Sequence, residues 1–142
     1  MLPKTIVVAT DFSEQAHRAI DYAVELAQKT DARVFVVNAY MAPSLGMPEL
    51  APGYTGLAEE AADDAQRQLD TLINGYSNAH VPMEGVLRCG DAVDSVVGVA
   101  KAVHADLIII GTHARKGLSR AVMGSVAESV VRNAPCAVLA VH

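Results

Sequence analysis

The sequence predicts a doubly wound α/β fold, in which helices cover both faces of a five-stranded parallel sheet. Apolar runs rich in Val, Ile, Leu and Ala alternate along the 142 residues with segments whose apolar residues recur at helical spacing. Hydrophobic residues make up 51% of the chain but aromatic residues only 4%, which is typical of a sheet buried under helices. The length suits one compact domain, so we expect residues 1–142 to form a single domain.

The chain begins with a buried strand, expected at Thr5–Ala9. A helix should follow over residues 13–30, with Ser13 as its N-cap because a serine hydroxyl accepts a hydrogen bond from a first-turn backbone N–H. The buried face of this helix should consist of Ala16, Ile20, Ala23, Val24 and Ala27. A second strand is expected over residues 33–39.

The middle of the chain opens with a stretch, residues 41–56, that contains three prolines and three glycines. Prolines and glycines at this density predict that no helix or strand forms here. Loops of this length are often lids or binding loops, and the sequence leaves open whether this one closes over a ligand. A helix over residues 57–76 and a third strand over residues 81–88 should follow.

A third helix is expected within residues 90–105, with Asp91 as its N-cap. Its buried face should consist of Val93, Val96, Val97 and Ala100. The run ADLIIIG at 105–111 predicts the fourth strand.

The end of the chain predicts a short helix over residues 126–132 and a fifth strand over residues 136–141. The sequence SVAE at 125–128 matches a capping box, in which Glu128 would reach back to the N-cap residue. That match explains the local sequence even if the helix binds nothing.

The alternation of strands and helices indicates parallel strands joined by right-handed crossovers. Ligands of such sheets bind at the carboxyl ends of the strands, where the strand order reverses. The first and fourth strands are the natural flanks of that point, and they end at Thr10–Asp11 and at Gly111. We therefore expect the functional site at these two strand ends.

Several residues at this edge can contact a ligand or serve the fold. Asp11 can accept hydrogen bonds from a base or ribose, or it can order the turn into the first helix. Gly111 lets a ligand approach the backbone. Gly124 and Ser125 open a helix whose N-terminal N–H groups suit a phosphate. Gly117 fits a turn in the intervening loop.

Three cations, Arg115, Lys116 and Arg120, lie within six residues of that loop. They can neutralise phosphates, or they can simply be solvated. The whole chain carries a net charge of −5 with a pI of about 5.4, which argues against a nucleic-acid-binding protein. It leaves room for a small basic pocket.

Other classes of site are not indicated by the sequence. It contains no clustered His and acidic residues for a metal, no G-x-S-x-G elbow, no P-loop and no G-x-G-x-x-G fingerprint.

Cys89 and Cys136 do not form a C-x-x-C pair, and we expect both to be small buried residues. The first ten residues predict neither a signal peptide nor a membrane anchor, so the expected location is the cytoplasm.

Two stretches resemble the universal stress protein family: IVVATDFSEQAHRAIDYAVELA near the start and ADLIIIGTHARKGLSRAVMGSVAESVVRNAPCAVLAV at the end. The resemblance runs from end to end. It implies an adenine-nucleotide α-hydrolase-like fold with strand order 3-2-1-4-5. It also implies a homodimer formed through the C-terminal strand, whereas an edge strand covered within a monomer is the alternative.

The nucleotide-binding branch of that family carries G-x2-G-x9-G-[ST]. On this chain the motif falls on Gly111, Gly124 and Ser125, but its second glycine is replaced by Ala114. The resemblance implies that ATP or AMP, with or without Mg, binds here, with the aspartate after the first strand and Ala39 near the adenine. The implied site residues are Thr10, Asp11, Ala39, Gly111, Thr112, Ala114, Arg115, Gly117, Gly124, Ser125 and Val126.

The departure at Ala114 leaves two functions open. If that position needs a positive φ, alanine costs roughly 1 kcal/mol there, and if the phosphate must touch the backbone, the methyl group intrudes. If φ is negative and there is space, the alanine has little effect. A penalty of about 1–2 kcal/mol weakens binding about 5- to 30-fold without abolishing it. The chain would then be a nucleotide-binding stress or signalling module in which any ATP hydrolysis is slow, since no general base is evident. The alternative is an interaction protein that acts through its dimer and a protein partner that the sequence does not identify.

A phospho-receiver domain is excluded because the paired acids, the phospho-acceptor and the lysine that it needs are missing.

Overall fold

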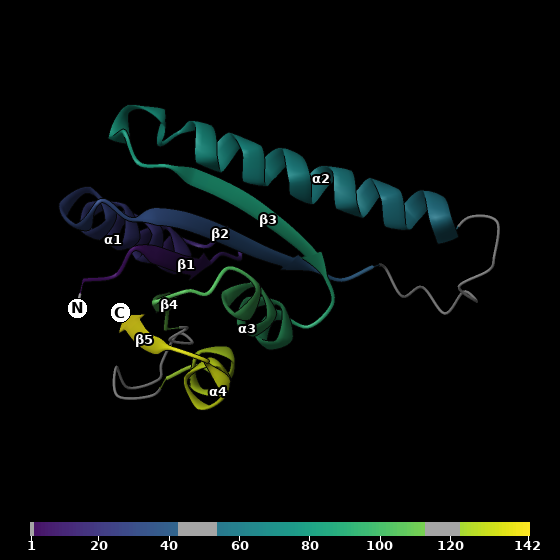
Figure 1. The fold of residues 1–142 in the computed structure, drawn as a ribbon. Coiled ribbons are helices and arrows are strands. Elements are labelled where there is room, and N and C mark those ends of the chain that lie inside the picture. Colours follow the sequence, from purple (N-terminus) through teal and green to yellow (C-terminus); the bar gives the residue numbers. More distant parts are fainter. Residues whose placement is uncertain (1, 43–53, 113–122) are drawn as a thin grey trace.

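The structure of the protein, a computed structural model, describes residues 2–42, 54–112 and 123–142 (Figure 1). Strands and helices alternate along the described chain. Their bounds are β1 Thr5–Ala9, α1 Glu14–Thr30, β2 Arg33–Tyr40, α2 Tyr54–Asn74, a short 3-10 helix Ser77–Ala79, β3 Met83–Cys89, α3 Ala92–Ala102, β4 Leu107–Gly111, α4 Ser125–Asn133 and β5 Ala137–Val141.

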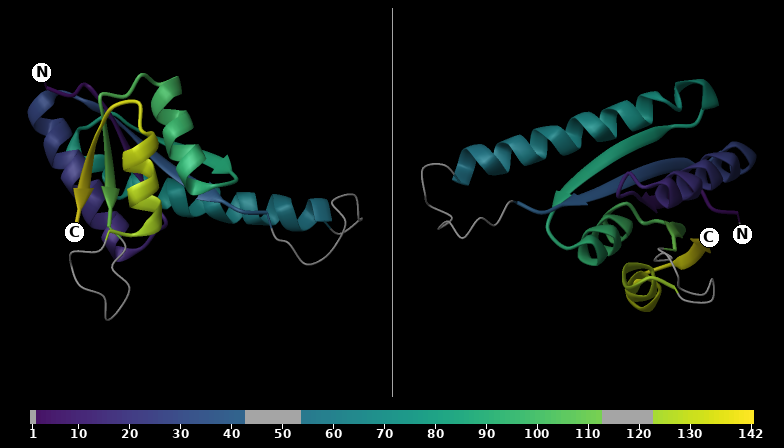
Figure 2. Two further views of the ribbon diagram at one scale, coloured as in Figure 1. Left: turned by 90° about the horizontal axis from the view of Figure 1, so that it is seen from below. Right: turned by 180° about the vertical axis from the view of Figure 1, so that it is seen from behind.

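The five strands form one parallel sheet in the order β3-β2-β1-β4-β5, which confirms the expected topology. Helices α1 and α2 cover one face and α3 and α4 cover the other (Figures 1 and 2). Side chains of β1 alternate between the two cores: Ile6 and Val8 pack with α1 and α2, whereas Val7 packs on the side of α3 and α4. The sheet is therefore buried on both faces.

The predicted caps of α1 and α3 are confirmed. The Ser13 hydroxyl accepts a hydrogen bond from the Ala16 backbone N–H at 3.2 Å, and the Asp91 carboxylate accepts one from the Asp94 N–H at 2.9 Å. The five apolar residues expected on the inner face of α1 are all buried. In α3 the valine stripe is buried except for Val93, which is half-buried.

Helix α2 begins earlier than expected, at Tyr54, and so includes part of the stretch 41–56 that we expected to be irregular. The last proline of that stretch precedes the helix, and a proline is tolerated at or before a helix start because no intrahelical bond is needed there. Gly56 lies in the first turn, at a cost of about 1 kcal/mol relative to alanine. The helix also ends earlier, at Asn74, and the short 3-10 helix after it was not expected.

The capping box expected at the start of α4 is wrong. The N-cap is Gly124, so Ser125 is already the first helical residue. Glu128 instead pairs with Arg132 one turn later, at 2.8 Å between carboxylate and guanidinium. A helix that starts one residue earlier puts the serine hydroxyl out of place for capping.

The cysteine expectation is also wrong in part. Cys89, the last residue of β3, is exposed, and Cys136 is half-buried beside β5. An apolar run in the sequence therefore does not by itself ensure that a cysteine is buried. In the described parts of the chain, no helix has the length and apolarity needed to cross a bilayer.

Candidate functional site

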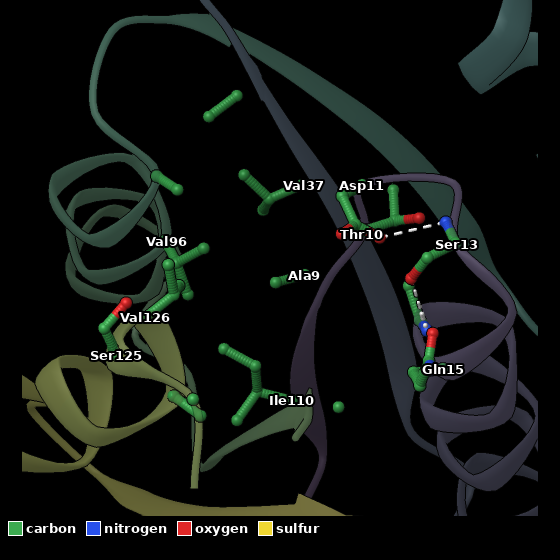
Figure 3. Close-up of a pocket in the computed structure, with 16 residues that line it drawn as sticks. Ala9, Thr10, Asp11, Ser13, Gln15, Val37, Val96, Ile110, Ser125 and Val126 are labelled. Atoms are coloured by element: carbon green, nitrogen blue, oxygen red, sulfur yellow. Dashed lines mark hydrogen bonds between the residues drawn. The ribbon is translucent and has the colours of Figure 1, made fainter. Parts of the chain in front are cut away.

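A cavity of about 370 Å³ lies at the carboxyl edge of the sheet, between the ends of β1, β2 and β4 and the first turns of α1, α3 and α4 (Figure 3). This is the edge at which the sequence predicted a site. The cavity is lined by Ala9, Thr10, Asp11, Ser13, Gln15, Ala16, Val37, Ala39, Ala92, Val96, Ile110, Gly111, Gly124, Ser125, Val126 and Ala127.

Most of the predicted site residues that the structure describes meet at this cavity. Those that line it are Thr10, Asp11, Ala39, Gly111, Gly124, Ser125 and Val126. Thr112 is not among the lining residues, because its hydroxyl lies 3.0 Å from Nδ1 of His142 and donates to the Val141 carbonyl at 3.3 Å. Ala114, Arg115 and Gly117, together with Lys116 and Arg120, lie outside the described residues.

The turn after β1 places Asp11 at the cavity. The Phe12 N–H donates to the Thr10 hydroxyl at 3.0 Å, and the Ser13 N–H donates to Oδ1 of Asp11 at 2.9 Å. Phe12 itself has a φ of 64°, a left-handed conformation that is uncommon for a bulky side chain. Asp11 therefore orders the turn, which was one of its two expected roles, while it also lines the cavity.

A residue that the sequence analysis missed fixes the same turn from β2. Asn38 is buried, and its side-chain amide donates to the Thr10 carbonyl at 2.9 Å. The Thr10 N–H donates to the Val37 carbonyl, also at 2.9 Å. The end of β1 is thus held to β2 by main-chain and side-chain bonds. The only sequence signal for this role is a lone amide within an apolar strand.

The sheet-facing part of the cavity is apolar. Val37 and Ile110 form its floor together with Ala9, and Val96 of α3 forms a wall (Figure 3). Ala92, the first residue of α3, also lines the cavity. Ala9 and Ala39 of the sheet and Ala92 of α3 contribute only small side chains to this part of the lining. The sequence placed the α3 valines in the core but did not indicate that this helix also lines the site.

Three helix N-termini face the cavity, and they differ in how their first N–H groups are satisfied. Helix α1 is capped by Ser13 and α3 by Asp91, each through its own side chain. The N-cap of helix α4 is Gly124, which has no side-chain oxygen to offer. Because a helix N-terminus without a side-chain cap favours an anion through its N–H groups and its dipole, α4 is the one of the three that best suits a phosphate.

Gly111 has a packing reason to be glycine. A Cβ at this position would lie 2.9 Å from the Gln15 carbonyl oxygen and 3.2 Å from its carbonyl carbon. The first turn of α1 therefore passes directly over the end of β4. This contact explains the glycine without a ligand, although Gly111 also lines the cavity.

Among the described residues that line the cavity, one side chain is charged. Asp11 is the only charged side chain among the described residues that line the cavity. The Asp11 carboxylate at one side and the N-terminus of α4, which has no cap from the Gly124 side chain, at the other give the cavity two distinct polar ends, separated by apolar surface (Figure 3). In the described residues, no group of three or more His, Cys, Asp and Glu side chains is placed to hold a metal.

Comparison with known proteins bears on this site. The model of the universal stress protein family matches residues 3–142. A universal stress protein of Methanocaldococcus jannaschii is 33% identical over 142 residues, which cover 99% of this chain and 82% of the relative. A universal stress protein structure from Lactobacillus plantarum superposes with a TM-score of 0.82 at 23% identity, covering 98% of this chain and 97% of that one. A universal stress protein solved in complex with cAMP matches at 27% identity with a TM-score of 0.74, covering 100% of this chain and 99% of the other.

Proposed function

The chain belongs to the universal stress protein family, and from this we propose that it binds an adenine nucleotide in the cavity at the carboxyl edge of the sheet. The observation that carries the proposal is that one cavity joins an apolar surface to the N-terminus of α4, whose N-cap residue Gly124 provides no side-chain cap. A nucleotide offers the same two parts, a flat base and an anionic phosphate. The similar protein solved with cAMP supports the adenine class.

The polarity of the cavity suggests how the nucleotide lies. The base fits between Ala39 of β2 and Ala92 of α3, with the Asp11 carboxylate beside it, and the phosphate lies at Ser125 and Val126. A volume of about 370 Å³ falls within the usual range for small-molecule sites. We propose ATP or AMP as the ligand, bound with or without a Mg ion on its phosphates. In sequence, Arg115 and Gly117 belong to the segment that joins Gly111 to Gly124, and we include them in the site.

The physiological role that follows is a nucleotide-dependent stress-response or signalling module, acting as a homodimer in the cytoplasm. The edge position of β5 supports the dimer, because within the described sheet this strand pairs only with β4. The free thiols of Cys89 and Cys136 fit a reducing compartment.

A second function is favoured by one observation, the alanine at position 114 in place of the motif glycine. An interaction protein that works through its dimer and a partner would not need nucleotide. Calorimetry distinguishes the two functions, because only the first requires the wild type to bind a nucleotide.

The test is titration of the purified protein with ATP, AMP and cAMP, with and without Mg, beside Ala114→Gly. We expect the wild type to bind in the micromolar range and Ala114→Gly to bind about 5- to 30-fold more tightly, if the alanine is strained. Binding by the variant alone would favour the interaction protein and place the loss at that methyl group. Failure of both to bind any of the three nucleotides would contradict the proposed function.

A further inference from the structure

Beyond the lining residues, one cation stands beside the part of the cavity assigned to the base. Ala39 of β2 is paired in register with Arg88 of β3. Neighbouring parallel strands lie about 4.8 Å apart, so these two residues are adjacent at the carboxyl edge of the sheet. Arg88 is exposed, and the sequence analysis assigned it no role.

The register also fixes the face on which Arg88 lies. Val37 and Val86 are register partners, and both pack in the core on the side of α3 and α4. Gly85 faces the opposite side, since a Cβ there would meet Leu69 and Ile73 of α2 at 2.9 and 2.8 Å. Because side chains alternate along a strand, Arg88 shares the face of Val86, which is the face of Ala39 and of the cavity.

The ionic surroundings of Arg88 distinguish it from the other cations of the described chain. Arg18, Arg67 and Arg132 are paired with acidic side chains. The Lys4 ammonium donates to the Thr30 carbonyl, and Arg33 lies over the Phe35 ring and near the Thr5 hydroxyl.

Three cations remain. Lys29 and Lys101 lie in the last turns of α1 and α3, where they complement the helix dipoles. No described acidic side chain pairs with Arg88. It is therefore the one unpaired cation of the described chain that stands at the ligand-binding edge of the sheet.

The spacing of Asp11 and Arg88 across β2 suits a purine. Asp11 follows β1 and Arg88 is the penultimate residue of β3, so the two residues flank β2 at roughly twice the strand spacing of about 4.8 Å. Between them lies Ala39, whose single methyl group leaves the surface of β2 open. A carboxylate only accepts hydrogen bonds and a guanidinium only donates them. Adenine presents both kinds of group along one edge, an amino donor and ring-nitrogen acceptors.

We propose that Arg88 is a further nucleotide-binding residue, whose guanidinium extends over Ala39 and donates a hydrogen bond to a ring nitrogen of the base. The inference rests on the proposed function, because it assumes that the base lies over Ala39. The phosphate end of the cavity, at α4, lies beyond β1 and β4, so Arg88 acts on the base.

The test compares the wild type with Arg88→Ala in calorimetric titrations with AMP, adenosine and the 1-, 3- and 7-deaza analogues of adenosine. Lys101→Ala is the matched control, since it removes an exposed cation from the last turn of α3, at the other end of the helix from Ala92. We expect Arg88→Ala to weaken both AMP and adenosine about tenfold, the loss of one charged hydrogen bond, and Lys101→Ala to change neither. One deaza analogue should bind the wild type and Arg88→Ala equally, because the acceptor is gone.

Each other outcome overturns the proposal. If Arg88→Ala binds adenosine as the wild type does, Arg88 does not contact the base, and if only AMP is weakened, it acts on the phosphate. If the tenfold loss persists for all three deaza analogues, the contact is not a hydrogen bond to a ring nitrogen. If the wild type binds neither AMP nor adenosine, the proposed function fails and this inference fails with it. That result is distinguishable from a failure of this inference alone, in which the wild type binds adenosine and Arg88→Ala binds it equally well.

Discussion

Single residues at the carboxyl edge serve the fold and the site together. Asp11 closes a turn through the Ser13 N–H while its carboxylate lines the cavity. Asn38 holds the Thr10 carbonyl from the neighbouring strand, and Phe12 takes a left-handed conformation between them. Because these contacts share one short turn, a change in packing there should move the polar end of the cavity as well.

Gly111 offers a direct test of that link. Gly111→Ala would place a Cβ 2.9 Å from the Gln15 carbonyl oxygen, so α1 or β4 must shift. We expect the free energy of unfolding to fall by about 1–3 kcal/mol, as for overpacking elsewhere, and nucleotide binding to weaken because Asp11 moves with α1. Urea denaturation and calorimetry measure the two effects.

The matched control is Gly98→Ala in α3, where a Cβ would meet nothing within 4 Å. That variant should be as stable as the wild type or up to about 1 kcal/mol more stable, since alanine favours a helix. Equal stability of Gly111→Ala and the wild type would show that the close approach of α1 to β4 is not a constraint.

At the scale of elements, much of the fold could be predicted from sequence because each strand and helix carries its own periodicity. The β1 run, the α1 stripe and the caps Ser13 and Asp91 were all recognisable locally. The starts of α2 and α4 were not, because proline and glycine act differently at a helix start than in its middle, and because capping depends on which residue enters the helix first.

The cavity was predictable only in outline. Its position follows from the rule for doubly wound sheets, and the residues of the motif were visible in the sequence. The contributions of Asn38, Ala92 and Arg88 were not visible, because they depend on register between strands and on how α3 lies over the sheet. Such relations join residues far apart in sequence, and no local pattern encodes them.

A contact between the segment before β4 and the start of β1, at the amino ends of the strands, predicts that stability depends on pH. The Asp106 carboxylate, just before β4, accepts hydrogen bonds from the Lys4 and Thr5 N–H groups at 2.9 Å each. These bonds lower the pKa of Asp106 from its ordinary 3.8, against an opposing effect of burial. A carboxyl whose folded pKa is depressed stabilises the fold above the unfolded value and loses that contribution as the pH falls through the folded value.

We therefore expect Asp106→Asn to be less stable than the wild type near neutral pH, with the difference shrinking below the folded pKa of Asp106. Urea denaturation at neutral pH and at several acid pH values measures it. A difference that stays constant over the whole range would show that protonation of Asp106 is not linked to folding.

At the scale of the whole molecule, β5 is an edge strand whose residues after Ala137 are half-buried. An apolar edge of this kind can pair with a second copy of the chain. We expect the wild type to sediment as a dimer and Ala137→Lys to shift toward monomer, because a charge on an edge strand opposes pairing. Ala137 is exposed, so the variant should keep its fold.

Ala102→Lys, at the exposed end of α3, is the control for added charge and should remain dimeric. A monomeric wild type at micromolar concentration would contradict the proposed dimer, and an unchanged Ala137→Lys dimer would place the interface elsewhere.

The central claim is that an adenine nucleotide binds in this cavity, with its base against α3. The most direct measurement is calorimetric titration of the wild type, Ala92→Trp and Ala102→Trp with ATP and AMP, after circular dichroism has confirmed that all three are folded. Ala92 lines the cavity, whereas Ala102 is exposed at the far end of the same helix. The indole should fill the slot between α3 and the sheet, so we expect Ala92→Trp to lose binding by about 100-fold or more and Ala102→Trp to bind as the wild type does. Undiminished binding by Ala92→Trp would show that the nucleotide lies elsewhere, and the absence of binding by the wild type would contradict the claim itself.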